Sequence, residues 1–405
     1  STRFGPAEAE VLPLPLRIVA DENMPGLAMF DALGTVVARP GRALSTRDLM
    51  QADVLLVRSV TRVDAALLEG TPVRFVGSAT IGTDHIDLSW LSQAGISFTH
   101  APGCNAMAVA EYTLQAVIEW LIATGRELSG LTLGVVGCGN VGSRVAALMR
   151  ALGVTVLCCD PPRQRRGEQV NGGWQSLDTV LGCDIVSLHV PLNRDGEDAT
   201  WHLLDRDRLR ALTSRQLLIN TCRGPVIDNQ ALMALPQQQL PALVLDVWEN
   251  EPLVMPGLFE RVLRGSAHIA GYSVEGRWRG SRMVLQGLRR WLGQVDDGSE
   301  PDPLQADWLQ PLSGLTDLLA LLRSRYRLGD DHQALLASLA APDPGKAFDL
   351  LRKHYPQRHE MRGTVVRAPV AASLLPLLSA LGVSVSPGIA SAGQDPHRRG
   401  GSSLR

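Results

Sequence analysis

Short apolar runs alternate with stretches of helical periodicity in the first part of the chain. The apolar runs predict strands at residues 16–20, 54–57, 73–76 and 96–99. Helical spacing between them predicts helices at residues 25–33 and 87–94. Because such alternation is typical of parallel strands joined by helical crossovers, we expect a first parallel-sheet unit here.

A second block shows the same alternation and is more strongly apolar. It begins with a predicted helix at residues 106–124, and its predicted strands lie at residues 132–137, 154–159, 184–190, 217–221 and 243–247. These strands are apolar on both faces, as expected of strands covered by helices on each side. The predicted fold class is therefore α/β, with two doubly wound parallel-sheet domains of Rossmann or flavodoxin type.

The rest of the chain predicts a helix, a linker and a small third domain. Helical periodicity covers residues 271–293, and the acidic, proline-containing segment 294–303 is typical of a linker. Helical spacing returns at residues 315–322 and 331–339, which favours a small C-terminal α+β domain over residues 304–385. The polar ends, residues 1–15 and 386–405, predict a disordered leader and tail.

Composition narrows the class of protein. The 405 residues are 45% hydrophobic and 20% charged, and the net charge of −2 argues against a dedicated nucleic-acid binder. The longest apolar candidate for a membrane span, residues 374–385, is broken by Pro376 and Gly382, and no secretory signal is evident. The six cysteines show no zinc-like spacing. We expect a cytoplasmic protein without a metal site and without nucleic-acid or membrane partners.

A glycine-rich turn gives the strongest local signal. The predicted strand at 132–137 leads into the GxGxxG pattern of Gly137, Gly139 and Gly142, and a predicted amphipathic helix follows. Gly137 permits the tight turn, Gly139 lets the backbone approach a pyrophosphate, and Gly142 lets the helix pack on the sheet. The free N–H groups at the start of such a helix bind phosphate.

An acidic residue after the next strand specifies the nucleotide. Asp160 stands 18 residues after Gly142, close to the roughly 20 residues expected for a ribose-binding acid. A carboxylate there accepts hydrogen bonds from a ribose 2′-hydroxyl and repels a 2′-phosphate, which favours NAD over NADP as the cofactor. Arg163 lies three residues further on, and an arginine there would suit a 2′-phosphate.

Three charged residues beyond later strands form a candidate catalytic set. His268 can act as a base, because a free histidine side chain exchanges its proton near working pH. A carboxylate such as Glu251 would orient the imidazole, and the planar fork of Arg223 fits a substrate carboxylate. Taken singly, each residue also fits a structural or surface role, and by composition alone Glu249 is as good a candidate as Glu251.

Several segments resemble the D-isomer-specific 2-hydroxyacid dehydrogenase family. They are residues 137–142, NTCRG at 220–224, DVWENEP at 246–252 and AHIAGY at 267–272. Further matching segments lie at residues 19–25, 57–61, 79–85, 101–106, 159–163 and 348–355, so the resemblance covers about residues 16–385.

The resemblance implies roles for individual residues. It makes Arg223 and Glu251 catalytic and His268 the proton donor, and it selects Glu251 over Glu249. Positions that match NAD contacts are those of Asn140, Val141, Asp160, Asp246 and Gly271. Val190 stands where the family often has Thr. A contact of NAD with the backbone would survive that change, and a contact with the hydroxyl would not. Ser59, Thr80 and Tyr272 match substrate-contacting positions.

The substrate can also be argued from chemistry. Arg58 and Ser59 follow one predicted strand of the first block, and Thr80 follows the next. An arginine with hydroxyl groups and a glycine-containing turn suits a phosphate, although ordinary loop residues would look the same. We therefore expect a small phosphorylated 2-hydroxy acid as substrate.

The resemblance also implies a domain plan. Residues 16–105 form a substrate and catalytic domain that the helix at 271–293 completes, residues 106–270 bind NAD, and residues 304–385 form a homodimer. The alternatives are a dehydrogenase of another D-2-hydroxy acid such as 3-phosphoglycerate, a non-catalytic NAD-sensing scaffold, and a regulatory role for the C-terminal domain.

Overall fold

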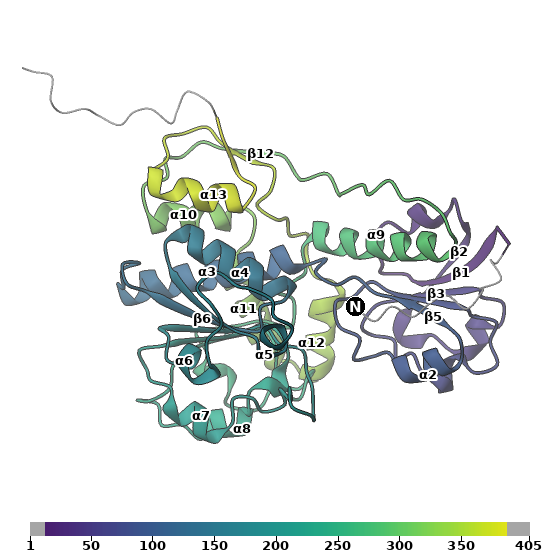
Figure 1. Cartoon of the computed structure of the whole chain (residues 1–405), viewed down its shortest axis with the longest axis horizontal. Helices are drawn as coiled ribbons and strands as arrows, with labels where there is room; N and C mark the ends of the chain where they lie inside the picture. The colour runs from purple at the N-terminus through teal and green to yellow at the C-terminus, as the bar shows by residue number, and fades with distance from the viewer. Residues whose placement is uncertain (1–12, 387–405) are drawn as a thin grey trace, which may run out of the picture.

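Three parallel sheets build the protein, which is described here by a computed structural model over residues 13–386. Figure 1 shows the first sheet at one end of the molecule and the second and third sheets at the other. The α/β fold class with two doubly wound sheets is confirmed. Residues 1–12 and 387–405, which hold most of the predicted leader and tail, lie outside the described residues.

The first sheet has the strand order β2-β1-β3-β4-β5, with all strands parallel. Its strands are β1 (Leu16–Asp21), β2 (Gly34–Arg39), β3 (Val54–Val57), β4 (Phe75–Ser78) and β5 (Ser97–Thr99). Helices α1 (Ala65–Leu68) and α2 (Leu88–Gln93) belong to this unit. The long helix α9 (Val274–Trp291) packs on it through Val284, Leu285 and Leu288, although the whole second sheet separates it from the first sheet in the sequence.

The expected helix at residues 25–33 is wrong in length. Only a short 3-10 helix forms, at Leu27–Phe30, after Gly26 takes a left-handed φ of 69°. The chain then turns into β2, which the apolar pattern did not predict. Strand β2 lies at the sheet edge and is largely exposed, so it lacks the apolar run of a buried strand.

The second sheet has the order β11-β10-β9-β8-β6-β7, again with all strands parallel. Its strands are β6 (Thr132–Val136), β7 (Thr155–Cys159), β8 (Ile185–Leu188), β9 (Leu217–Asn220), β10 (Ala242–Leu245) and β11 (Arg264–Gly265). Helices α3 (Ala106–Thr124) and α4 (Asn140–Leu152) cover one face, and α6 (Leu177–Leu181), α7 (Arg206–Ala211) and α8 (Asn229–Met233) contribute to the other.

Helix α3 corrects one expectation from the sequence. By length and composition it could cross a membrane, whereas the apolar runs had suggested that no segment could. In the structure, 83% of its apolar window is buried inside the protein. Its high hydropathy therefore reflects a core helix, packed between α4 and the C-terminal unit.

The C-terminal unit shares its core with the second sheet. Strands β12 (Ala306–Trp308), β13 (Thr364–Val366) and β14 (Ser384–Val385) form the third sheet. Around them lie α10 (Leu315–Arg323), α11 (Leu328–Leu339), α12 (Pro344–Lys353) and α13 (Leu375–Ala380). Side chains of α10 and α13 join the apolar cluster of α3 and α4, while Leu335 and Phe348 of α11 and α12 join the cluster on the other face.

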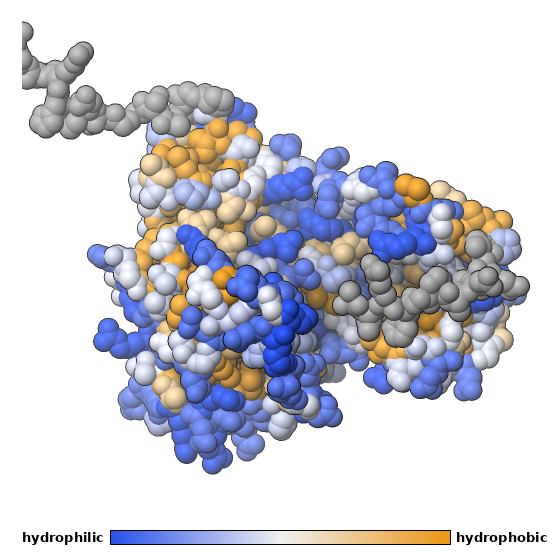
Figure 2. All heavy atoms as spheres, in the orientation of Figure 1, coloured by the Kyte–Doolittle hydropathy of each residue, from blue (hydrophilic) through white to orange (hydrophobic). Residues whose placement is uncertain are grey.

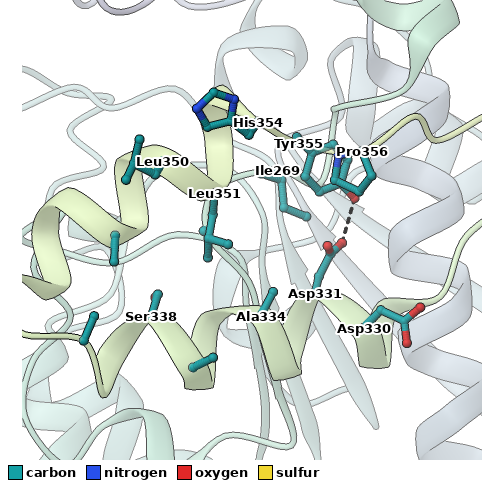
Figure 3. Close-up of a pocket in the computed structure, with 14 residues that line it drawn as sticks. Ile269, Asp330, Asp331, Ala334, Ser338, Leu350, Leu351, His354, Tyr355 and Pro356 are labelled. Carbon is teal, nitrogen blue, oxygen red and sulfur yellow. Dashed lines mark hydrogen bonds between the residues drawn. The ribbon is translucent and has the colours of Figure 1, made fainter.

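A buried carboxyl group fixes the segment that follows α12. Asp331 on α11 accepts hydrogen bonds from the hydroxyls of Tyr326 (2.7 Å) and Tyr355 (2.8 Å). Figure 3 shows Asp331 and Tyr355 pointing toward one another beside a groove of about 540 Å³ between α11 and α12. Burial raises the pKa of Asp331 to about 6, although both hydroxyls stabilise its charge.

This raised pKa predicts a pH-dependent stability. An unfolded Asp titrates near pH ~4, so between about pH 4 and 6 the folded protein keeps a proton that the unfolded chain has lost. Stability from this group is therefore lost as the pH rises through that window. Between pH 4 and 7, we expect the free energy of unfolding of Asp331→Asn to rise relative to wild type by about 2–3 kcal/mol.

Urea unfolding of both proteins at the two pH values measures this difference. Asp330→Asn, a change at the exposed neighbour on the same helix, is the matched control and should show no such trend. A constant difference between Asp331→Asn and wild type across the range would contradict the assignment.

Candidate active site

The candidate site residues follow the strands of the second sheet. The glycine turn follows β6, Asp160 follows β7 and Val190 follows β8, while Arg223, Glu251 and His268 follow β9, β10 and β11. Because all six strands are parallel, these residues lie at one edge of the sheet. This is the edge at which open α/β sheets bind ligands.

His268 and Glu251 form a hydrogen-bonded pair. The His268 Nδ1 lies 2.8 Å from the Glu251 Oε2, and the other oxygen of Glu251 accepts the backbone N–H of Trp248 at 2.9 Å. Burial opposes ionisation of Glu251, but the charge and hydrogen bond of His268 and the Trp248 N–H hold the pKa of this carboxyl below its usual value. Glu251 is thus an ionised partner that contacts Nδ1 of His268 and not its Nε2.

Asp246 holds the loop that carries His268. Its buried carboxylate accepts hydrogen bonds from the Ser266 hydroxyl and from the N–H groups of Ile269 and Ala270, at 2.6 to 3.0 Å. Its carbonyl accepts the N–H of His268 at 2.7 Å. His268 has a φ of 57°, a conformation that a non-glycine residue rarely adopts unless its surroundings impose it. In the structure Asp246 therefore positions His268; a contact of Asp246 with NAD stays a prediction.

Arg223 reaches from the second sheet to a loop of the first. Its Nη2 and Nε lie 2.8 Å and 3.2 Å from Asp84 Oδ2. A side chain at Gly82 would collide with the guanidinium, so the glycine makes the approach possible. Burial would raise the pKa of Asp84, but the charge and hydrogen bonds of Arg223 hold it below its usual value. The guanidinium thus binds a carboxylate from the first-sheet unit, and its contact with a substrate carboxylate stays a prediction.

The glycine turn has the shape that a pyrophosphate requires. Gly137 has a φ of 83°, and a side chain on Gly142 would meet the Gly137 carbonyl. A Cβ on Gly139 would meet nothing within 4 Å, and no side chain caps the first turn of α4. Backbone donors therefore face open space at a helix N-terminus, which fits a bound dinucleotide phosphate.

Asp160 and Arg163 lie beside this turn. Asp160 accepts the N–H of Cys138 at 2.8 Å and caps α5 (Pro161–Arg165) through the N–H of Arg163. The Arg163 guanidinium is ion-paired with Glu168 at 2.6 Å, hydrogen-bonded to the Cys138 carbonyl and placed over the Trp174 ring. Because these contacts already engage Arg163, the residues at this position fit the 2′-hydroxyl of NAD better than the 2′-phosphate of NADP.

Asp160 gives a prediction about cofactor choice. Asp160→Ala should raise the Michaelis constant for NAD by about tenfold and narrow the preference for NAD over NADP, because a charged hydrogen bond is worth about 1.5–3 kcal/mol. Asp160→Asn keeps an oxygen for the α5 cap and controls for local unfolding. The ratio of kcat/KM for the two nucleotides measures the effect. An unaltered preference in both variants would remove Asp160 from this role.

Of the four predicted substrate residues, the structure brings Arg58 and Tyr272 together in the lining of one small pocket. Ser59 is exposed, whereas Arg58, Thr80 and Tyr272 are half-buried. The Thr80 hydroxyl lies 2.6 Å from the Ser78 hydroxyl and donates to the Gly82 carbonyl at 2.8 Å, so it also shapes the loop that meets Arg223. Their contact with substrate stays a prediction.

Glu249 serves a different histidine. It is hydrogen-bonded to His202 Nε2 and also accepts the N–H of Asn229 at 2.9 Å. Together with Asp228, these side chains could place three ligand atoms within 4.8 Å of one another. Asp228 caps α8, however, so both carboxylates already have structural roles, and we assign no metal to the cluster.

Sequence reasoning missed two charged residues of the cleft. Asp84 lies in the TDHID segment, whose acids suggested helix capping, and only the fold brings it to Arg223. Arg352 lies in the segment 348–355, which matched the family without a role for any single residue. In the structure Arg352 lines a pocket with Arg58 and Tyr272.

Comparisons with known proteins agree with this geometry. Residues 109–269 match the family model described as D-isomer specific 2-hydroxyacid dehydrogenase, NAD binding domain. The chain is 46% identical to an erythronate-4-phosphate dehydrogenase of Pseudomonas fluorescens, over 90% of this chain and 98% of that protein. It is 44% identical to one from Pseudomonas aeruginosa, over 91% of this chain and all of that protein.

Solved structures are similar to about two thirds of the chain. The TT0316 protein of Thermus thermophilus has a TM-score of 0.58 and 26% identity, covering 69% of this chain and 98% of that one. The D-lactate dehydrogenase of Aquifex aeolicus, complexed with NAD and lactic acid, has a TM-score of 0.55 and 26% identity, covering 68% of this chain and 96% of that one. The chain therefore belongs to the D-isomer specific 2-hydroxyacid dehydrogenase family, in its erythronate-4-phosphate dehydrogenase group.

Proposed function

We propose that this protein oxidises 4-phospho-D-erythronate at C2 with NAD, which yields 3-hydroxy-2-oxo-4-phosphooxybutanoate. The observation that carries the proposal is the His268–Glu251 pair, which stands at the same sheet edge as Arg223 and the glycine turn. The names of the relatives, which align over nearly their whole length, support the choice of substrate.

The catalytic roles follow from the side chains. His268 Nε2 takes the proton of the C2 hydroxyl as general base, since Nδ1 is held by Glu251. The Glu251 carboxylate then stabilises the imidazolium, which later returns its proton to water. NAD, when bound, supplies the acceptor for the C2 hydride.

Arg223 binds the substrate carboxylate and polarises the C2 oxygen. Its guanidinium presents two N–H donors on one edge, and in this structure that edge contacts Asp84. The substrate carboxylate would take the place of Asp84, so Asp84 holds Arg223 ready in the substrate-free protein.

Turnover of purified protein separates this proposal from its alternatives. NADH formation with 4-phospho-D-erythronate but not with 3-phosphoglycerate is the expected result. The reverse preference would favour a different D-2-hydroxy acid. NAD binding without turnover of either acid would favour an NAD-sensing scaffold, although such a scaffold would not need the His268–Glu251 pair.

We further propose a cytoplasmic homodimer that acts in pyridoxal 5′-phosphate synthesis. Apolar side chains on the C-terminal unit support the dimer: Leu304, Leu309 and Leu375 are 46%, 66% and 36% exposed. Figure 2 shows apolar surface over this unit. Leu309→Asp should lower the solution mass to that of one chain; an unchanged dimer would leave a regulatory role as the better explanation of the unit.

A further inference from the structure

We propose that Arg352 on α12, together with Arg58 and Arg277, binds the phosphate group of the substrate. The C-terminal unit would then complete the substrate pocket and select phosphorylated acids. This inference rests on the proposed function, since it names the residues that recognise one end of that substrate.

A small pocket brings three distant parts of the chain together. It has a volume of about 70 Å³, and its walls include Arg58 after β3, Tyr272 after the His268 loop, and Arg352 and Lys353 at the end of α12. Arg42 on the first-sheet side is ion-paired with Asp349 of α12 at 3.0 Å. Helix α12 therefore contacts the first-sheet unit beside this pocket, and Figure 1 shows it between the two large lobes.

Arg352 is half-buried, and none of the ion pairs of residues 13–386 includes it. Its Nε is hidden from solvent and has no hydrogen-bond partner among the described residues. The guanidinium lies over the Tyr272 ring, 5.8 Å from its centroid. Burial opposes its charge, but Tyr272 and Glu251 raise the pKa of this group, so Arg352 shares the electrostatic environment of the catalytic pair.

Arg277 of α9 contacts the same ring. Its guanidinium lies 5.7 Å from the Tyr272 centroid, and none of the ion pairs of residues 13–386 includes it. Burial and the positive charge of Arg58 both lower the pKa of Arg277, which means that Arg58 and Arg277 are close enough to repel each other.

The positive charges at this site are not balanced by the acids that line it. Asp349 is engaged by Arg42, and Glu22 is exposed at the rim. Holding Arg58, Arg277 and Arg352 around one tyrosine costs free energy that a bound dianion would offset. A phosphate monoester supplies two charges and several acceptor oxygens that guanidinium groups can share. The substrate carboxylate has its own partner in Arg223.

Relatives of different substrate class differ in how much of this chain they cover. The Aquifex D-lactate dehydrogenase structure, which contains lactic acid, covers 96% of its own chain but only 68% of this one. The two parallel-sheet units and α9 make up a share of this chain similar to the share that this structure covers. The erythronate-4-phosphate dehydrogenases align over 90% or more, so they include most of the additional part. A C-terminal unit that supplies Arg352 would explain why it accompanies a phosphorylated substrate.

The contacts of α12 show that it can present Arg352 rigidly. Phe348 is buried in the core against the second sheet, and the hydrogen bond from Tyr355 to Asp331 anchors the chain just after the helix. Tyr355 also meets the edge of the Tyr272 ring, with centroids 5.6 Å apart.

Replacing Arg352 with Met tests the proposal. Met keeps an unbranched apolar side chain against Tyr272 but removes the charge. For 4-phospho-D-erythronate we expect KM to rise at least about 100-fold, while turnover of unphosphorylated D-erythronate and the dissociation constant of NAD change less than about threefold. Calorimetric titration with inorganic phosphate should show at least tenfold weaker binding than to wild type. Arg352→Lys, which keeps a charge without the fork, should lie between the two.

Lys346→Met is the matched control, because Lys346 is an exposed cation on α12 outside the pocket. It should behave as wild type in every assay. An Arg352→Met protein with wild-type melting temperature that keeps its KM and its phosphate affinity would overturn the proposal. So would equal losses with the phosphorylated and unphosphorylated acids.

The phosphate titration also separates this inference from the proposed function. If wild type oxidised neither 4-phospho-D-erythronate nor 3-phosphoglycerate but bound phosphate through Arg352, the proposed reaction would be wrong and the anion site would stand. If wild type oxidised 4-phospho-D-erythronate but Arg352→Met left its KM unchanged, the reaction would stand and the anion site would be wrong.

Discussion

His268→Asn is expected to lower kcat by about 10²–10⁴-fold, while the dissociation constant of NAD stays within about threefold of wild type. Asparagine can keep a hydrogen bond to Glu251 but cannot take a proton from a substrate hydroxyl. The glycine turn that would hold NAD lies after β6, whereas His268 follows β11, so the two functions should separate. Steady-state rates and fluorescence titration with NADH measure the two effects.

Glu251→Gln is the companion variant, since it keeps the shape but loses the charge beside His268. It should retain more activity than His268→Asn, because the imidazole is still present. It should be less active than wild type, because the carboxylate no longer stabilises the protonated imidazole. If His268→Asn lost NAD affinity by a factor comparable to its loss of kcat, His268 would instead have a structural role.

Arg223→Lys is expected to lower kcat/KM by about 10²–10³-fold. Lysine keeps the positive charge but not the planar pair of donors, which in this structure meets Asp84 at 2.8 and 3.2 Å. KM should rise and kcat should fall, because Arg223 is proposed to hold the carboxylate and to polarise the C2 oxygen. Steady-state kinetics with varied substrate at saturating NAD measure both constants.

Asp84→Asn provides the control for the ion pair itself. If Arg223 acted only by joining the two sheets, Asp84→Asn and Arg223→Lys would lose similar activity and similar melting temperature. A strong loss confined to Arg223→Lys supports the role in substrate binding, and near-wild-type kinetics in that variant would contradict it.

The buried strands were predictable because their apolar runs carry the signal of a two-sided sheet. The strand at 54–57 and the helix at 106–124 coincide with β3 and α3. Elements without that signal were missed. Strand β2 is an exposed edge, and β12 and β14 are only three and two residues long. Such strands depend on tertiary pairing more than on their own composition.

The candidate site was predictable where parallel strands impose it. Residues that follow β6 to β11 must share one edge, so the set containing Asp160, Arg223 and His268 could be named in advance. Contacts between units could not be named in that way. The pair of Arg223 with Asp84 and the approach of Arg352 to Tyr272 depend on how separate units meet, and no spacing in the chain encodes that.

Transfer of deuterium from C2 of the substrate tests the central claim most directly. The protein is mixed with NAD and 4-phospho-D-erythronate that carries deuterium at C2, and the reduced nucleotide is analysed by mass spectrometry. We predict NADH that contains the deuterium, formed by wild type and formed at least about 100-fold more slowly by His268→Asn. Absence of NADH with wild type, or equal rates for the two proteins, would contradict the account.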